Sequence, residues 1–287
     1  VFQEALRLDP GYVEAHNNLA SAYKEQGRLE EALAAYGVAL GLDPQSASTH
    51  YNRSLALLQS GDYREGWKEY EWRWKRKQAG RRTFKQPRWD GSPLEGRTIL
   101  LWCEQGLGDA IQFVRCAPLV KARGGRVVLE CPPFMAPLFS TLAGVDAVVA
   151  EGTALPEYDV QAPLMSLPML LGTTLDTVPA DVPYLHAEAG RVEKWKARQE
   201  GVGGFKVGVV WQGNPHHPWD RWRSFPLACL APLAAVEGVR LLSLQKGAGV
   251  EQIKALKGRF AVEDLGGGLD AEGGAFLDTA AVMKNLD

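Results

Sequence analysis

A short turn that is rich in glycine is the first place where this chain could do chemistry. It runs Gln105-Gly106-Leu107-Gly108-Asp109 and follows an apolar run. Its backbone N–H groups and the start of the next helix could therefore face an anion or the polar atoms of a ligand. Asp109 has two interpretations of about equal weight. It caps the helix, or it is a general base that removes a proton from a hydroxyl group.

A second polar stretch lies between residues 212 and 226. Arg221 and Arg223 precede the expected helix start near Pro226 and could clamp a diphosphate, because guanidinium forks match phosphate oxygens in pairs. An ordinary surface loop is the alternative. Lys246, in a small turn after the apolar run 240–244, offers another cation toward the same cleft.

Several other kinds of site are disfavoured. The first turn does not match the Gly-x-Gly-x-x-Gly motif of dinucleotide-binding proteins, because Ile111 occupies the position of the third glycine. Glu130 nevertheless lies where such proteins have the acid that binds the ribose. His216 and His217 are adjacent rather than spaced i, i+4, so we expect no metal and no bound cofactor. The sequence also lacks a Gly-x-Ser-x-Gly elbow and a Walker lysine motif, which argues against a serine hydrolase and a P-loop NTPase.

Composition is typical of a globular protein of 287 residues, with 46% hydrophobic and 23% charged residues. The formal net charge of -2 leaves no global polycation, so we expect no nucleic-acid partner. The most apolar loop-like stretch, residues 162–172, is much shorter than the ~20 apolar residues that a membrane span needs. Four cysteines without a CxxC pair are typical of reduced thiols and predict a cytoplasmic location.

The elements that position these turns begin with a repeat of 34 residues. Ala-Leu-Arg-Leu-Asp-Pro at 5–10 recurs as Ala-Leu-Gly-Leu-Asp-Pro at 39–44. The interlocking small and large residues of a tetratricopeptide repeat lie between them: Leu19, Ala20, Tyr23, Gly27, Ala32 and Tyr36. Arg73 stands where the second unit has Ala39, which suits a terminal repeat that packs against something other than another repeat. We assign residues 1–78 to the repeats.

A basic linker is expected over residues 79–97. Residues 73–88 carry eight basic side chains and no acid, beside Trp72, Trp74 and Trp89. Such a pattern could follow a nucleic-acid backbone. Because the whole chain is nearly neutral, we favour a joint whose tryptophans seat the repeats on the next domain.

From Thr98 onward, short apolar runs alternate with helical stretches, which predicts parallel sheets with crossover helices. The expected strands are 98–103, 126–131, 146–150 and 158–162, then 206–211, 240–244 and 261–264. The expected helices are 109–123, 134–142, 226–236, 249–257 and 272–286. This predicts α helical repeats followed by two Rossmann-like α/β domains, 98–200 and a partial domain 201–287. Since open sheets of this type usually have ~5–6 strands, we expect the second domain to be incomplete and the chain to be truncated at both ends.

Together these stretches resemble bacterial proteins in which tetratricopeptide repeats precede a glycosyltransferase of the heptosyltransferase type, glycosyltransferase family 9, with the two-domain GT-B arrangement. In layout they are more distantly similar to the O-linked N-acetylglucosamine transferases. The resemblance covers essentially the whole chain, and the stretches that carry it are 95–109, 112–115, 117–119, 172–176, 209–215 and 243–247.

The resemblance implies inverting, metal-independent transfer of a sugar from a nucleotide-diphosphate donor to an acceptor hydroxyl. It implies that Asp109 is the base, with Gln105, Gly106 and Gly108 in the turn on the acceptor side. The implied donor and phosphate ligands are Arg221, Arg223, Asn214 and Lys246. At Arg223 the family commonly has lysine, and at Phe225 it has tryptophan.

One departure from the family pattern bears on activity. The family's aspartate and histidine donor signature would begin beyond Asp287, so we expect this polypeptide to be a catalytically impaired fragment. The expected partners are a nucleotide sugar and a protein or peptide bound by the repeats. The alternative is a non-catalytic scaffold whose repeats bind a peptide, because fold alone does not fix function.

Overall fold

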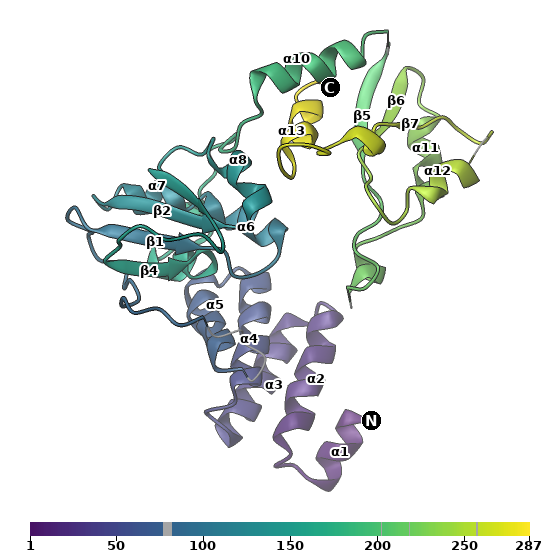
Figure 1. Cartoon of the computed structure of the whole chain (residues 1–287). Helices are drawn as coiled ribbons and strands as arrows, with labels where there is room; N and C mark the ends of the chain where they lie inside the picture. Colours follow the sequence, from purple (N-terminus) through teal and green to yellow (C-terminus); the bar gives the residue numbers. More distant parts are fainter. Residues whose placement is uncertain (77–81, 202, 218, 257) are drawn as a thin grey trace. The chain divides into compact units, whose positions relative to one another are not determined.

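The computed structural model of the chain describes residues 1–76, 82–201, 203–217, 219–256 and 258–287 (Figure 1). Two compact units are distinguished by their internal contacts. Unit 1 comprises Val1–Glu130, Gly144–Ala147 and Ala154–Asp181. Unit 2 comprises Cys131–Ala143, Val148–Thr153 and Val182–Asp287. The predicted boundaries after residues 78, 97 and 200 stay predictions, and the first of them lies outside the described residues.

Unit 1 begins with antiparallel helix pairs, as the 34-residue period predicts. The helices are α1 (Phe2–Leu8), α2 (Val13–Glu25), α3 (Leu29–Leu42), α4 (Ala47–Ser60) and α5 (Tyr63–Tyr70), followed by the 3-10 turn η1 (Glu71–Lys75). Ala20, Ala32, Ala56 and Tyr36 are fully buried against one another, because the small alanines let neighbouring helices approach and the tyrosine fills the remaining space. Gly27 has φ 76°, a left-handed turn conformation that glycine adopts without strain.

The first sheet has the strand order β3-β2-β1-β4. Its strands are β1 (Thr98–Trp102), β2 (Arg126–Cys131), β3 (Ala147–Ala150) and β4 (Val160–Pro163). β1 pairs in parallel with both β2 and β4, and its buried apolar run is typical of a strand covered on both faces. The α/β prediction is confirmed here.

Short helical segments connect these strands. They are α6 (Leu107–Val114), α7 (Ala117–Lys121), η2 (Pro133–Met135), α8 (Ala136–Phe139), η3 (Leu164–Ser166), α9 (Leu167–Leu170) and η4 (Leu175–Thr177). The single helix predicted over 109–123 is two helices, because Pro118 has no N–H to continue the first and is favourable at the start of the second.

The residues that follow the repeats return to the edge of the sheet. Trp89 donates its backbone N–H to the Gln161 carbonyl at 2.8 Å, and Gln161 donates to the Pro87 carbonyl at 3.1 Å, so Arg88 forms a parallel bridge with β4. The prediction of a joint falls partly on Lys77 and Arg81, which lie outside the described residues.

Unit 2 contains a parallel sheet in the order β5-β6-β7. Its elements are α10 (Ala189–Arg198), β5 (Phe205–Val209), η5 (Asp220–Trp222), η6 (Leu227–Leu230), α11 (Ala231–Ala234), β6 (Val239–Ser243), α12 (Glu251–Ala255), β7 (Glu263–Asp264), η7 (Gly266–Gly268) and α13 (Leu277–Met283). α10, which the sequence analysis missed, packs on α13 through Trp195, Ala281 and Val282. A separate cluster packs Val209 and Leu241 of the sheet against Trp211, Leu227 and Leu256.

Helices in unit 2 are shorter than predicted. The helix expected over 226–236 is a 3-10 turn followed by one turn of α-helix, and the helix expected over 272–286 begins only after Phe276, whose φ is 65°. Within the part of the chain that the structure describes, no helix combines the length and the apolar character that crossing a bilayer requires.

Candidate functional site

The glycine-rich turn lies at the carboxyl end of β1. α6 begins at Leu107 with Gly106 as its N-cap residue, and Asp109 is the third residue of the helix. One carboxylate oxygen of Asp109, Oδ2, accepts the Gly106 backbone N–H at 3.0 Å. Oδ1 has no hydrogen-bond partner among the described residues, and the side chain is half-buried. Asp109 therefore caps the helix with one oxygen while the other can still accept a proton.

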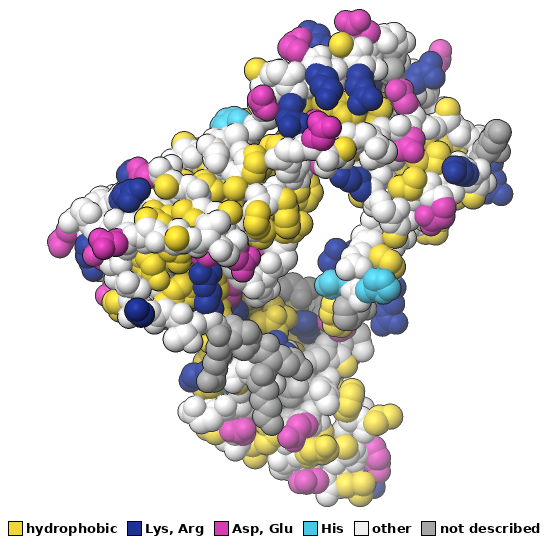
Figure 2. Space-filling model, in the orientation of Figure 1, with side chains coloured by type: hydrophobic (Ala, Val, Ile, Leu, Met, Phe, Trp, Pro, Cys, Tyr) yellow, Lys and Arg dark blue, Asp and Glu magenta, His cyan; other side chains and the backbone are white. Residues whose placement is uncertain are grey.

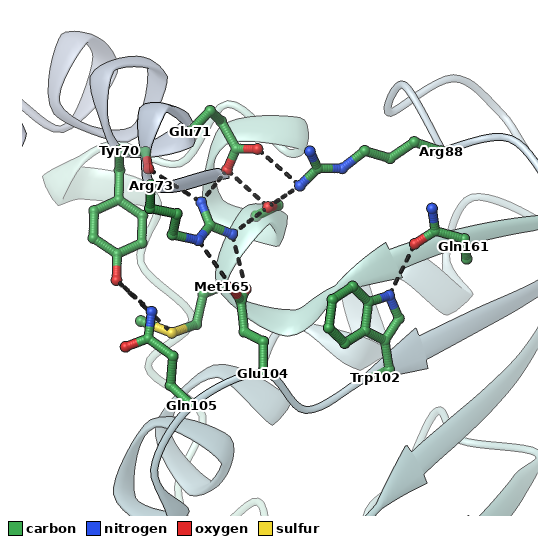
Figure 3. Close-up of polar contacts among 10 residues, drawn as sticks. Tyr70, Glu71, Arg73, Arg88, Trp102, Glu104, Gln105, Gln161 and Met165 are labelled. Atoms are coloured by element: carbon green, nitrogen blue, oxygen red, sulfur yellow. Dashed lines mark hydrogen bonds and ion pairs between the residues drawn. The ribbon is translucent and has the colours of Figure 1, made fainter. Parts of the chain in front are cut away.

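A buried ionic network, which the sequence analysis missed, lies directly before this turn (Figure 3). The guanidinium of Arg73, in the 3-10 turn η1, is 6% exposed and binds both oxygens of Glu104, with distances of 2.9 Å from Nε and 2.8 Å from Nη2. Arg73 also donates to Glu71 Oε1 at 2.6 Å and to Ser166 Oγ at 2.7 Å. Arg73 is thus matched by Glu104 and by Glu71 of its own turn, and Glu71 also pairs with Arg88 at 2.8 Å.

Electrostatics and burial keep Arg73 charged and Tyr70 protonated. Burial alone would lower the pKa of the Arg73 guanidinium, but hydrogen bonding and the charges of Glu104 and Glu71 outweigh burial and raise that pKa. Burial raises the pKa of the Tyr70 phenol well above its usual value. The Tyr70 hydroxyl therefore stays protonated, accepting from Gln105 Nε2 at 3.0 Å and donating to Met165 Sδ at 3.9 Å.

A hollow of about 390 Å³ lies beside β1 and β4 and is lined in part by Trp102 and Gln161. Trp102 and Phe84 line it with ring centroids 5.2 Å apart, and the Trp102 indole donates to Gln161 Oε1 at 2.8 Å (Figure 3). Glu130, the candidate acid for a ribose, is 3% exposed and accepts from Arg82 Nη2 at 2.8 Å. That pairing argues further against a dinucleotide site, because the Glu130 carboxylate is already used.

In unit 2, a buried glutamine joins the loops that follow β5 and β6. Gln245 is 2% exposed, and its Oε1 accepts the backbone N–H groups of Trp211 and Gln212, both at 3.0 Å. Its Nε2 donates to the carbonyls of Gln212 at 2.9 Å and Ala248 at 2.8 Å. A fully satisfied buried amide of this kind holds both loops in one arrangement.

A second polar network closes the loop after β5. Asp220 accepts from Gln212 Nε2 at 2.7 Å and from Ser224 Oγ at 2.6 Å, while Ser224 Oγ accepts the Gly213 N–H at 2.8 Å. No Cβ would fit at Gly213 without movement, because it would lie 2.8 Å from Asp220 Oδ1 and 3.3 Å from Arg223 Nη2. The network thus fixes the backbone from which the two arginines project.

The predicted donor ligands lie on these two loops. Arg221 and Arg223 are exposed and form no ion pair with any described residue. The Arg221 guanidinium lies 5.1 Å from the Trp222 ring. Asn214 is exposed and its side-chain oxygen accepts the His216 N–H at 3.0 Å, whereas Lys246 Nζ donates to the Leu269 carbonyl at 2.5 Å. Figure 2 shows histidine, basic and hydrophobic side chains gathered on the exposed end of the loop after β5.

Metal ligation finds no support in this geometry. Among the described residues, no three His, Cys, Asp or Glu side chains lie close enough to hold an ion. The nitrogen Nδ1 of His217 instead accepts the Trp219 backbone N–H at 3.1 Å within the loop.

Comparison with known families confirms the repeats. A tetratricopeptide repeat model matches residues 1–34, and a TPR repeat model matches residues 20–61. The N-terminal region therefore consists of tetratricopeptide repeats.

Protein FlbA of Caulobacter vibrioides is similar to nearly the whole chain. The two are 31% identical over 290 residues, which cover 92% of this chain and 48% of FlbA. The chain thus spans about half the length of this relative.

Solved structures identify the fold of the region after the repeats. A glycosyl transferase family 9 protein from Veillonella parvula superposes with a TM-score of 0.50 at 10% identity, covering 70% of this chain and 76% of that protein. E. coli ADP-heptose LPS heptosyltransferase II gives a TM-score of 0.43 at 15% identity, covering 65% and 76%. The superposition on the Veillonella parvula protein shows that the repeats are followed by a GT-B-like α/β region whose fold is similar to that of a family 9 glycosyltransferase.

Proposed function

We propose that the chain is the repeat-bearing part of an inverting, metal-independent glycosyltransferase that uses a nucleotide-diphosphate sugar. The observation that carries this proposal is the position of Asp109 at the carboxyl end of β1, with one oxygen used as a cap and the other without a partner among the described residues. Ligands of open α/β sheets bind at this edge, and a GT-B-like fold accompanies it here.

Asp109 would act as the general base on the acceptor. As the acceptor oxygen forms its bond to the anomeric carbon, its proton passes to Asp109, and the bond from that carbon to the diphosphate oxygen breaks. The leaving diphosphate takes the electron pair. The Gly106 N–H at the start of α6 holds the Asp109 carboxylate in place through its hydrogen bond to Oδ2.

Unit 2 would stabilise the leaving diphosphate. Arg221 and Arg223 are the exposed guanidiniums of a loop that Asp220 and Gln245 hold in place. Donors fixed in advance stabilise developing negative charge without reorganising during the reaction. Asn214 and Lys246 would complete the phosphate contacts.

The proposal also covers the binding partner of the repeats and the cellular location of the protein. We propose that the repeats bind a protein or peptide partner, as tetratricopeptide repeats commonly do. Four cysteines without a CxxC pair fit a reducing, cytoplasmic setting.

The test compares Asp109→Asn with a matched cap variant, Asp62→Asn, in the full-length protein. Asp62 caps α5 by accepting the Glu65 N–H at 3.2 Å, far in sequence from the turn. Release of nucleoside diphosphate is measured with a panel of UDP-, GDP-, CDP- and ADP-sugars. Asp109→Asn should lower turnover ~10²–10⁴-fold while Asp62→Asn leaves it unchanged. Equal turnover in both variants would reduce Asp109 to a cap, whereas absence of turnover in the unmodified protein would favour the scaffold alternative.

A further inference from the structure

The terminal repeat contacts the residues that lead into the acceptor-side turn. Tyr70 ends α5, and Arg73 follows in η1. Arg73 holds Glu104 through a two-point guanidinium–carboxylate contact, and Tyr70 holds the Gln105 amide. All four residues lie within unit 1.

Each residue between strand and helix is anchored. Cys103 donates its N–H to the Glu130 carbonyl at 3.2 Å, continuing the β1–β2 ladder. Glu104 and Gln105 are held by the repeat, and Gly106 by Asp109. Two of the four anchors between Trp102 and Leu107 therefore come from the terminal repeat.

The contact between Arg73 and Glu104 fixes the orientation of the Glu104 side chain. Its two parallel bonds fix the plane of the Glu104 carboxylate, and Ser166, Glu71 and the Tyr70 carbonyl accept from the remaining three N–H groups of the guanidinium. Buried ion pairs are often no more stabilising than apolar residues of the same size, so stability alone does not account for such a cluster. Fixed geometry is what the cluster supplies.

We propose that Arg73 and Tyr70 are positioning residues for the Gly106–Asp109 turn, so that the terminal repeat is part of the acceptor-side site as well as a support for partner binding. The inference rests on the proposed role of Asp109. Neither residue touches substrate in this account. They act by holding Glu104 and Gln105, from which the backbone runs into α6.

Hydrogen exchange tests the inference without any substrate. The variants are Arg73→Lys, which keeps the charge but loses the two-point contact, and Tyr70→Phe, which removes one hydroxyl. Exchange of amides in 103–110 should become about tenfold faster in Arg73→Lys, since local opening governs exchange, and should rise by less in Tyr70→Phe. The matched control is Arg28→Ala, which breaks an exposed guanidinium–carboxylate pair with Glu31 and should leave 103–110 unchanged.

Transfer by the full-length protein supplies a second measurement. Arg73→Lys should lower kcat about tenfold with little change in donor KM, because misplacement of a catalytic group slows the chemical step. It should cause no further loss when added to Asp109→Asn, a result that a merely structural role would not give.

The possible failures are distinguishable. Unchanged exchange of 103–110 in both Arg73→Lys and Tyr70→Phe would overturn the inference and leave the proposed function standing. Absence of transfer in the unmodified full-length protein would contradict the proposed function, while the exchange experiment would still decide whether the repeat holds the turn.

Discussion

The second repeat and the terminal repeat place the same register positions against different neighbours. Tyr36 and Tyr70 are 34 residues apart, as are Ala39 and Arg73. In the second repeat the Tyr36 hydroxyl contacts Ser21 Oγ at 3.0 Å, and Ala39 is fully buried among helices. In the terminal repeat the corresponding pair binds Gln105 and Glu104 of the α/β region.

The comparison shows what a repeat changes where the array ends. The tyrosine is kept and only its hydroxyl partner differs, whereas the small residue becomes an arginine that meets a carboxylate. A position that lets two repeat helices approach thus becomes a polar contact with another kind of element. Substitutions in either repeat can test this difference.

The largest effect is expected from Ala39→Arg, which gives the second repeat the residue of the terminal one. Ala39 is fully buried, so the larger guanidinium would be overpacked and would bring a charge into a site that now holds a methyl group. The free energy of unfolding should fall by about 5 kcal/mol in urea denaturation. A loss below about 1 kcal/mol would show that the two positions do not differ as described.

Glu104→Ala removes the carboxylate that Arg73 of the terminal repeat binds. It leaves the buried guanidinium of Arg73 with only Glu71 as an acidic partner inside the network. The expected loss is about 3–4 kcal/mol of unfolding free energy, measured in the same way. The exposed Glu31→Ala is the control and should lose less than about 1 kcal/mol. Equal losses in the two variants would contradict the buried character of the contact.

The double variant Arg73→Met, Glu104→Met makes position 73 of the terminal repeat apolar, as position 39 of the second repeat is. Because both charges are removed together, stability should return to within about 2 kcal/mol of the unmodified chain. Hydrogen exchange of 103–110 should nevertheless stay fast. Slow exchange in this variant would mean that packing alone positions the turn.

The smallest effect concerns pH and the two tyrosines. Burial raises the pKa of both Tyr36 and Tyr70. Above about pH 10 the phenols ionise in the unfolded chain while the buried ones stay protonated, so stability falls as pH rises, by at most about 1.4 kcal/mol per pH unit for each tyrosine. Tyr70→Phe should make this decline shallower in denaturation at pH 9 to 11.5. An unaltered slope would contradict the burial of Tyr70.

Much of the fold is predictable because its signals are local. The 34-residue period and the apolar runs predicted the helix pairs and strands, since repeat packing and buried parallel strands need those residues at those spacings. The polar turn containing Asp109 was predictable for the same reason: glycines and a capping acid follow an apolar run.

The contacts that support the site were not predictable from sequence. Arg73 and Glu104 are 31 residues apart, and only tertiary packing brings them together. Arg73 in place of a small repeat residue indicates a contact outside the repeats, but the sequence does not show that Glu104 is the partner. Around Lys246 the sequence indicates only a turn, because the role of the buried Gln245 amide depends on which backbone groups surround it.

Whether Asp109 is the base, and whether the terminal repeat positions its turn, is decided by transfer turnover at saturating donor in one series of full-length proteins. The series is the unmodified protein, Asp109→Asn, Arg73→Lys and the control Arg28→Ala. Turnover should fall ~10²–10⁴-fold in Asp109→Asn and about tenfold in Arg73→Lys, and should not change in Arg28→Ala. Equal turnover in all four proteins would contradict both the role of Asp109 and the positioning of its turn by the terminal repeat.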